Sequence, residues 1–254
     1  SANKKLLNFD ISFDKVNFKY DDTGIQALNN VSFTLESGKT LAVMGPTGSG
    51  KTTLLQLLSK TYLPHSGKVS LGNSALQDYS QHDIREIMGV VPQQPFLFSD
   101  TIAHNIRFGK PDATEEEIEK AAKQASVHAN IVGFKAGYET MLGERGITLS
   151  GGQKQRVSIA RALIKNPKIL LLDDCLSAVD TETEEAILNE LKKNNKDTST
   201  IIVCHRVSSA KNADYILVLK DGEIAQYGTH KELVNKAGYY KELYEEQRIE
   251  ETKT

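Results

Sequence analysis

A glycine-rich run followed by a lysine and two threonines is the segment best suited to chemistry. It matches the pattern G-x-x-x-x-G-K-[ST] at every fixed position. Glycines let backbone N–H groups curl around an anion, and a helix that begins there directs its positive end at the same anion. Lys51 adds a mobile charge for phosphates, and the Thr52 hydroxyl can bind Mg²⁺. The predicted nucleotide-binding residues of this loop are Gly45, Pro46, Thr47, Gly48, Ser49, Gly50, Lys51, Thr52 and Thr53.

A second signal is an apolar run that ends in two carboxylates. Residues 169–172 have the composition of a buried strand, and Asp173 and Asp174 follow them directly. A phosphate-binding loop needs an acid for its metal, and this pattern is typical of a Walker B strand. We therefore predict that Asp173 and Thr52 hold Mg²⁺ together.

The string Leu149-Ser150-Gly151-Gly152-Gln153 precedes a basic, helix-like segment. It is the signature of the ABC family, and with the two motifs above it makes nearly the whole chain resemble an ABC transporter nucleotide-binding domain. The resemblance implies that Leu149, Ser150, Gly151, Gly152 and Gln153 contact ATP held by the opposite subunit. A helix N-terminus with free N–H groups suits a γ-phosphate. The alternative is that Ser150 only caps its own helix.

The resemblance extends to single residues in the expected order. Tyr20 resembles the aromatic residue that stacks on adenine, although a tyrosine beside a turn also suits packing. Gln93 resembles the glutamine that touches Mg²⁺ and the attacking water, with Gln94 as a one-residue alternative. The segment 177–180 resembles the D-loop, and His205 resembles the switch histidine that contacts the γ-phosphate.

Two further strings narrow the subtype. Residues 94–98 (QPFLF) and 143–146 (GERG) are similar to those of exporters, where the second string lies near the coupling helices of the membrane domain. The resemblance thus implies ATP-driven export. The alternative is a soluble ABC ATPase, but such proteins usually carry two tandem cassettes or long insertions.

Position 174 departs from the family's pattern, in which a glutamate follows the Walker B aspartate and polarises the attacking water. Asp174 keeps the charge on a side chain one methylene shorter. Because a misplacement of about 1 Å costs on the order of a hundredfold in rate, we expect tight ATP binding and slow hydrolysis. In heterodimeric exporters one site is often degenerate, so we expect one half of such a pair. The alternatives are that the backbone shifts to let Asp174 act as base, or that the chain is a regulatory ATP-binding module.

Strands and helices alternate along the chain. We expect strands at 31–35, 40–44, 69–71, 88–91, 169–172, 200–203 and 215–219, and helices at 52–60, from 114, at 150–165 and at 182–193. A last helix should pack Tyr240, Leu243 and Tyr244 inward. This order implies βαβ crossovers. The expected fold is α/β, a RecA-like P-loop NTPase with a parallel-sheet core, an N-terminal antiparallel β subdomain and an inserted α-helical subdomain.

We expect a single domain over residues 1–254. Its β and core subdomains would cover 1–90 and 160–235, a helical subdomain with the signature 95–159, and a helical tail 236–254.

Composition argues against several other functions. The net charge is −2 and no basic block occurs, so nucleic acid is not an expected partner. Cys175 and Cys204 are too few for a disulfide scaffold and suggest buried, reduced thiols in the cytosol. No apolar run approaches the roughly 20 residues needed to span a bilayer. The start at Ser1 has no signal-peptide pattern and suggests a cut or processed end.

The resemblance implies the setting. We expect ATP and Mg²⁺ as cofactors and the cytoplasmic face of the cell membrane as the location. The expected partners are a second ABC nucleotide-binding domain, in a heterodimer ahead of a homodimer, and the coupling helices of a transmembrane domain.

Overall fold

The computed structural model describes residues 9–143, 148–194 and 197–251. Its first layer is a small antiparallel sheet in the order β2-β1-β4-β5. Its strands are β1 (Ile11–Lys19), β2 (Gln26–Leu35), β4 (Ser66–Leu71) and β5 (Ser74–Ala75). The buried apolar residues of β1, Ile11, Phe13, Val16 and Phe18, are unevenly spaced because Lys15 has φ 50° and the pairing with β2 shifts register between Phe13 and Val16.

The second layer is a larger sheet with strand order β10-β9-β3-β8-β7-β6. Its strands are β3 (Thr40–Met44), β6 (Met88–Val91), β7 (Ile169–Asp173), β8 (Ser199–Val203), β9 (Tyr215–Lys220) and β10 (Glu223–Gly228). All neighbouring pairs are parallel except β9 and β10. We did not predict β10. The sequence does contain a hairpin signal, the dipeptide Asp221-Gly222, and both residues have the positive φ that a tight hairpin turn requires.

Ten α-helices occur among the described residues. They are α1 (Lys51–Leu58), α2 (Gln81–Ile87), α3 (Ile102–Arg107), α4 (Glu115–Gln124), α5 (His128–Val132), α6 (Gly151–Leu163), α7 (Thr181–Asn194), α8 (Val207–Ala210), α9 (His230–Leu233) and α10 (Tyr239–Glu251). Thr114 and Glu117 form the predicted capping box of α4. The helical stretch begins earlier than predicted, at α3. The predicted tail, 236–254, contains α10, and the short helix α9 precedes it.

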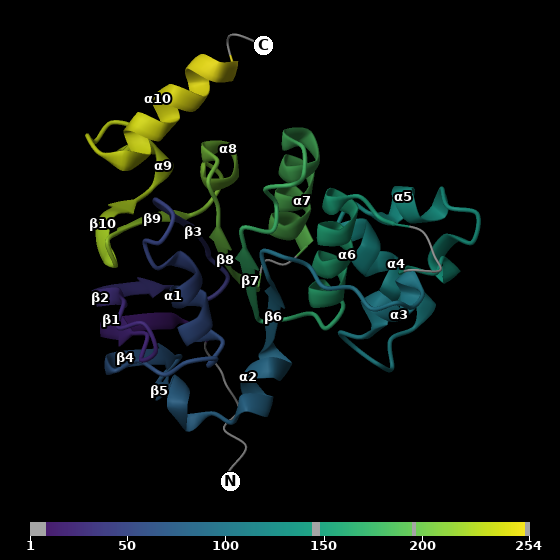
Figure 1. Cartoon of the computed structure of the whole chain (residues 1–254), viewed down its shortest axis with the longest axis horizontal. Helices are drawn as coiled ribbons and strands as arrows, with labels where there is room; N and C mark the ends of the chain where they lie inside the picture. The colour runs from purple at the N-terminus through teal and green to yellow at the C-terminus, as the bar shows by residue number, and fades with distance from the viewer. Residues whose placement is uncertain (1–8, 144–147, 195–196, 252–254) are drawn as a thin grey trace.

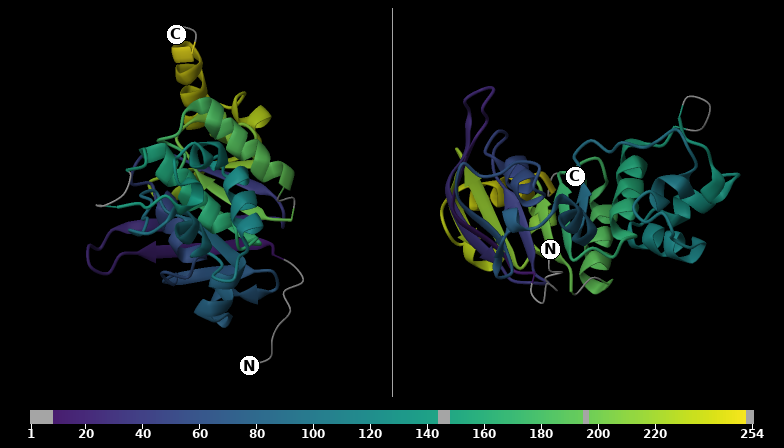
Figure 2. Two further views of the ribbon diagram at one scale, coloured as in Figure 1. Left: turned by 90° about the vertical axis from the view of Figure 1, so that its right-hand side faces the viewer. Right: turned by 90° about the horizontal axis from the view of Figure 1, so that it is seen from below.

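Helices α3 to α6 gather at one end of the molecule, beyond β6, and the antiparallel sheet lies at the other end (Figure 1). The view from below shows the same division (Figure 2). The larger sheet therefore stands between a β layer and a helical layer, as the predicted fold class requires. The exact subdomain boundaries stay predictions.

The period of two in the parallel strands explains this layering. Leu41, Leu171 and Ile201 lie in an apolar cluster shared with the antiparallel sheet and α1. Their neighbours Ala42 and Leu172 lie in a second cluster with α3, α4 and α6. Each strand thus contributes to two cores, which fixes its register. Among the described residues, no helix is long and apolar enough to cross a membrane.

Candidate functional site

Four parallel strands deliver the predicted site residues to one edge of the sheet. β3 leads into the glycine-rich loop, β6 into Gln93, β7 into Asp173 and Asp174, and β8 into His205. Ligands of open α/β sheets bind outside the carboxyl ends of the strands. A cavity of about 340 Å³ lies there, and the predicted residues that line it are Tyr20, Thr47, Gly48, Gly50, Lys51, Thr52, Thr53, Gln93, Asp173, Asp174 and His205.

The loop geometry requires glycine at two of its positions. Gly45 has φ +139°, and a Cβ there would lie 2.0 Å from the carbonyl oxygen of Leu219. Gly50 has φ +100°, and its Cβ would lie 2.3 Å from the oxygen of Ala27. Gly50 is the N-cap of α1 and makes no side-chain cap bond. The first N–H groups of α1 therefore lack a side-chain acceptor, as in helix termini that bind anions.

Lys51 and Ser49 put polar atoms into the interior of this loop. Lys51 Nζ donates to the carbonyl oxygens of Gly45 and Pro46, at 2.8 Å each. Burial lowers the pKa of Lys51, while Asp174 and Asp173 oppose that effect. The Ser49 hydroxyl is buried without a hydrogen-bond partner among the described residues. A buried cation beside an unpaired hydroxyl fits a loop that cradles phosphate oxygens.

The two carboxylates have different surroundings. Thr52 Oγ1 donates to Asp173 Oδ1 at 3.1 Å, and burial raises the pKa of Asp173 against that bond. Asp174 has φ 45°, a left-handed conformation that aspartate tolerates better than most residues. Its Oδ2 accepts from Gln93 Nε2 at 3.0 Å and lies 3.8 Å from His205 Nε2. Of the two candidate glutamines, Gln93 is the one at the site.

Tyr20 lies at the side of the cavity, where side chains of α1, the helix that follows the glycine-rich loop, hold it. Its hydroxyl lies 2.9 Å from Thr53 Oγ1 and donates to Gln56 Oε1 at 3.0 Å. Its ring meets Phe18 edge-on at 5.0 Å and Tyr62 at 5.7 Å. The tyrosine therefore both packs and borders the cavity, so the two readings of the sequence are compatible.

The signature residues do not line this cavity. Ser150 is the N-cap of α6, and its hydroxyl accepts from Gln153 N while Gln153 Oε1 accepts from Ser150 N. Ser150 thus does cap its own helix. A Cβ on Gly152 would lie 3.1 Å from the oxygen of Ala178, so the start of α6 packs against the 177–180 loop. Nothing in this arrangement places Leu149–Gln153 near the chain's own glycine loop.

An apolar groove lies beside the signature. It is lined by Pro95, Phe96, Leu97, Phe98, Leu142, Gly143, Thr148, Leu149 and Lys154. Phe96 at its rim is 66% exposed, which is unusual for so large an apolar side chain. Of the string 143–146, only Gly143 lies within the described residues.

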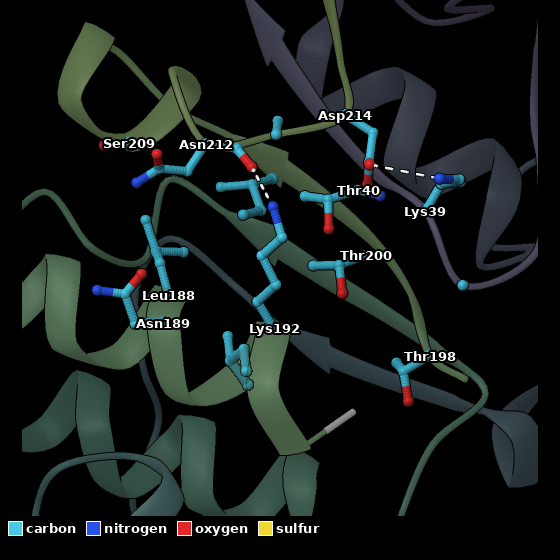
Figure 3. Close-up of a pocket in the computed structure, with 14 residues that line it drawn as sticks. Lys39, Thr40, Leu188, Asn189, Lys192, Thr198, Thr200, Ser209, Asn212 and Asp214 are labelled. Carbon is cyan, nitrogen blue, oxygen red and sulfur yellow. Dashed lines mark hydrogen bonds and ion pairs between the residues drawn. The ribbon is translucent and has the colours of Figure 1, made fainter. Parts of the chain in front are cut away.

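A second cavity, of about 280 Å³, opens at the opposite end of β3 and β8 (Figure 3). Thr40 and Thr200 lie at the start of their strands there, and Lys39 pairs with Asp214 at 3.6 Å. Lys192 Nζ donates to the carbonyl oxygen of Asn212 at 3.2 Å. None of the predicted site residues lines this cavity. The chemistry-bearing side chains are therefore sorted to one end of the strands.

Sequence reasoning missed one cluster next to the site. Arg206 Nη1 donates to the carbonyl oxygen of Val179 at 3.1 Å and to Glu184 Oε2 at 3.0 Å, and its Nη2 donates to the oxygen of Ser177 at 3.3 Å. Glu184 is 2% exposed and also accepts from the Ser209 hydroxyl. A buried carboxylate needs such partners. The available signal was an arginine directly after His205.

These features define the site of a P-loop nucleotide-binding domain with a separate signature helix. The family model described as "ABC transporter" matches residues 28–177, and the chain belongs to that family. It is an ABC ATP-binding domain, a class of ATPases.

Named relatives point to exporters. The chain is 49% identical over 245 residues to the uncharacterized ABC transporter ATP-binding protein YknU of Bacillus subtilis, covering 96% of this chain and 42% of that protein. It is 48% identical to the multidrug resistance-like ATP-binding protein MdlA of Buchnera aphidicola, covering 98% of this chain and 42% of that protein. A solved bacterial Atm1-family ABC exporter with ATP bound superposes with a TM-score of 0.90 at 39% identity, over 95% of this chain and 42% of that one.

The chain thus spans less than half the length of these relatives. The comparisons confirm the family, the fold and the exporter type of its relatives.

Proposed function

We propose that this domain binds ATP with Mg²⁺ and hydrolyses it to drive export across a membrane, from the cytoplasmic face. The observation that carries the proposal is the convergence of the glycine loop, Gln93, Asp173, Asp174 and His205 at one cavity. No other cavity described above combines an anion-binding loop with acids and a histidine.

Each residue has a role in this proposal. Tyr20 borders the adenine, while Gly45–Thr53 and Lys51 in particular bind the phosphates. Thr52 and Asp173, together with Gln93, would hold Mg²⁺, since hydroxyl and carboxylate oxygens suit this ion. Bound Mg²⁺ would offset charge on the phosphate oxygens.

The water that attacks the γ-phosphate would be oriented by Asp174, Gln93 and His205. Their contacts converge on one oxygen, Asp174 Oδ2. In such a constellation the carboxylate of Asp174 can accept a proton from water, while His205 contacts the γ-phosphate. Because the aspartate is short, we propose that this chain's own site turns over slowly.

The signature supports a dimer. Leu149–Gln153 lies outside the chain's own cavity, and its helix N-terminus suits a phosphate. We propose that these residues complete the nucleotide site of a second ABC domain. The two domains would form a heterodimer, and the other half would carry the family's glutamate at the position of Asp174. A regulatory role with little hydrolysis of its own is the second candidate, and Asp174 is the observation in its favour.

The groove at Phe96 suits the other partner. It is apolar, lies beside the signature and carries one cation, Lys154. We propose that a coupling helix of the transmembrane domain docks there. When two nucleotide-binding domains close around ATP, the groove would move together with α6. This movement would transmit the closure to the transmembrane domain.

Lys51→Ala tests the nucleotide site. Loss of a charge-assisted contact to phosphate should weaken binding about 10- to 100-fold. Isothermal titration with ATP and Mg²⁺ measures this. Lys123→Ala is the control, because that lysine forms only an exposed pair with Glu119. Equal affinity of the Lys51→Ala variant and the unmodified protein would refute the proposed site.

Export itself is tested on the full-length protein with its partner half in proteoliposomes. We expect ATPase activity that requires Lys51 and changes when Phe96→Ala alters the groove. The isolated Phe96→Ala domain should bind ATP as the unmodified domain does. An ATPase indifferent to the groove in the assembled protein would contradict the coupling role.

A further inference from the structure

The C-terminal helix α10 reaches back to the loop that carries His205. One side chain, Gln247, makes both contacts: its Oε1 accepts from Val207 N at 2.8 Å, and its Nε2 donates to the carbonyl oxygen of His205 at 3.0 Å. The amide of Gln247 thus holds the backbone on either side of Arg206. The two segments lie about 40 residues apart in sequence.

The two hydrogen bonds of Gln247 can restrain the His205 loop only if α10 itself is held in place, and buried contacts in its first turn do this. Tyr240 in its first turn is 0% exposed, and its hydroxyl lies 2.8 Å from His230 Nδ1. The backbone N–H of Tyr240 also donates to Gln226 Oε1 at 3.0 Å. Gln247 follows Tyr240 by two helical turns and so lies on the same face of α10. The packed residue therefore fixes where the amide points.

Gln247 also supplies a hydrogen-bond acceptor for a backbone N–H group at the start of α8. Helix α8 has only four residues, and its N-cap, Arg206, makes no side-chain cap bond. The first N–H groups of a helix need an external acceptor. Gln247 supplies one to Val207 from another element. Without it, this turn of backbone would have water as its partner and a wider choice of conformations.

The other side of the loop is held by the Arg206 cluster. The guanidinium binds the carbonyl oxygens of Ser177 and Val179 and the buried carboxylate of Glu184. The side chain of His205, in contrast, is 44% exposed and lies 3.8 Å from Asp174. The direction of the imidazole therefore depends on the backbone that Gln247 and Arg206 fix.

We infer that Gln247 is a positioning residue for His205, and that α10 thereby sets the turnover rate at the nucleotide site. The inference rests on the proposed function, in which His205 contacts the γ-phosphate. It assigns a role in hydrolysis to a helix outside every motif of the site. Tyr20 and the phosphate-binding loop, which bind ATP in the proposed function, lie on other elements. Gln247 should therefore affect kcat far more than the KM for ATP.

The test uses the full-length protein assembled with its partner half, in which the partner's own site has been inactivated so that turnover reports this chain. Gln247→Ala should lower kcat about tenfold, as expected for two lost hydrogen bonds that hold a reacting group in place. The KM for ATP should change less than about twofold. Gln247→Glu keeps the acceptor for Val207 but loses the donor to His205, so it should show a similar defect. Glu246→Gln, an exposed neighbour on α10, is the control and should leave kcat unchanged.

A double-mutant cycle separates positioning from general loosening. Single-turnover hydrolysis by His205→Ala should not fall further when Gln247→Ala is added, because the group to be positioned is gone. Multiplicative losses in the cycle, or a Gln247→Ala variant with unchanged kcat, would overturn the inference while leaving the proposed function intact. Absence of any hydrolysis at this chain's site in the unmodified assembly would instead overturn hydrolysis by this chain, and the role of Gln247 with it.

Discussion

The side-chain amide of Gln93 donates to Oδ2 of Asp174 over 3.0 Å, across a sequence separation of 81 residues. His205 Nε2 lies 3.8 Å from the same oxygen. Residues that follow β6, β7 and β8 thus meet at a single carboxylate atom. The length of that carboxylate's side chain decides where the oxygen sits relative to any attacking water.

Asp174→Glu should raise the rate of ATP hydrolysis at this chain's own site about 10- to 100-fold, because the longer side chain brings the carboxylate closer to an in-line water. Steady-state phosphate release by the domain measures the change. Asp174→Asn, which keeps the shape and loses the charge, is the control and should hydrolyse no faster than the unmodified chain. Equal rates for the aspartate and glutamate forms would eliminate the degenerate-site proposal.

Ser150→Ala should separate the two roles of the signature serine. Ser80 caps α2 in a capping box of the same geometry, so Ser80→Ala is a matched control. Each variant should lose about 1 kcal/mol of unfolding free energy in urea titrations. Only Ser150→Ala should also slow ATP hydrolysis in the assembled dimer. If the two variants had the same ATPase rate, Ser150 would be a helix cap and nothing more.

Asp173→Asn should stabilise the isolated domain at neutral pH. Burial raises the pKa of Asp173 in the folded state, so the charged carboxylate costs stability as pH rises above its unfolded value of about 3.9. Thermal unfolding at pH 7 should show a higher Tm for the variant, while the two proteins should converge near pH 4. ATP hydrolysis should fall at the same time. A variant that was less stable at pH 7 would contradict the assignment of burial as the dominant effect.

Arg161→Lys should destabilise the junction between α6 and the segment after Gln93. The guanidinium binds the backbone oxygens of Asn105 and Phe96 and the side chain of Asn105, and lies 5.5 Å from the Phe98 ring centroid. Lysine cannot reproduce this planar fork. We expect a loss of about 1 to 3 kcal/mol in urea unfolding. Arg85→Lys, on an exposed position of α2, should cost close to nothing, and an Arg161→Lys variant as stable as that control would show that the fork contributes little.

The sequence alone determined the chemistry-bearing residues. The spacing of Gly45, Gly50 and Lys51 specifies an anion-binding loop because only glycine tolerates the positive φ and the close carbonyl contacts found there. Hydrophobic periodicity placed most strands and the box at Thr114 and Glu117 because burial and capping are local patterns. Hydrophobic periodicity does not indicate the hairpin strand β10, because the one buried residue in it is the polar Gln226.

Only the tertiary structure decided which residues meet. In the larger sheet β6 lies beside β7, which brings the segment after β6 close to Asp174. In that segment Gln93, rather than Gln94, reaches the carboxylate. The signature lies away from the chain's own glycine-rich loop. The contacts of Arg206 with Glu184 and of Gln247 with the His205 loop join distant segments. Side-chain periodicity fixes the face on which a residue lies, but the partner across that face depends on how the elements pack. For that reason the sequence predicted the site's components, and the fold assembled them.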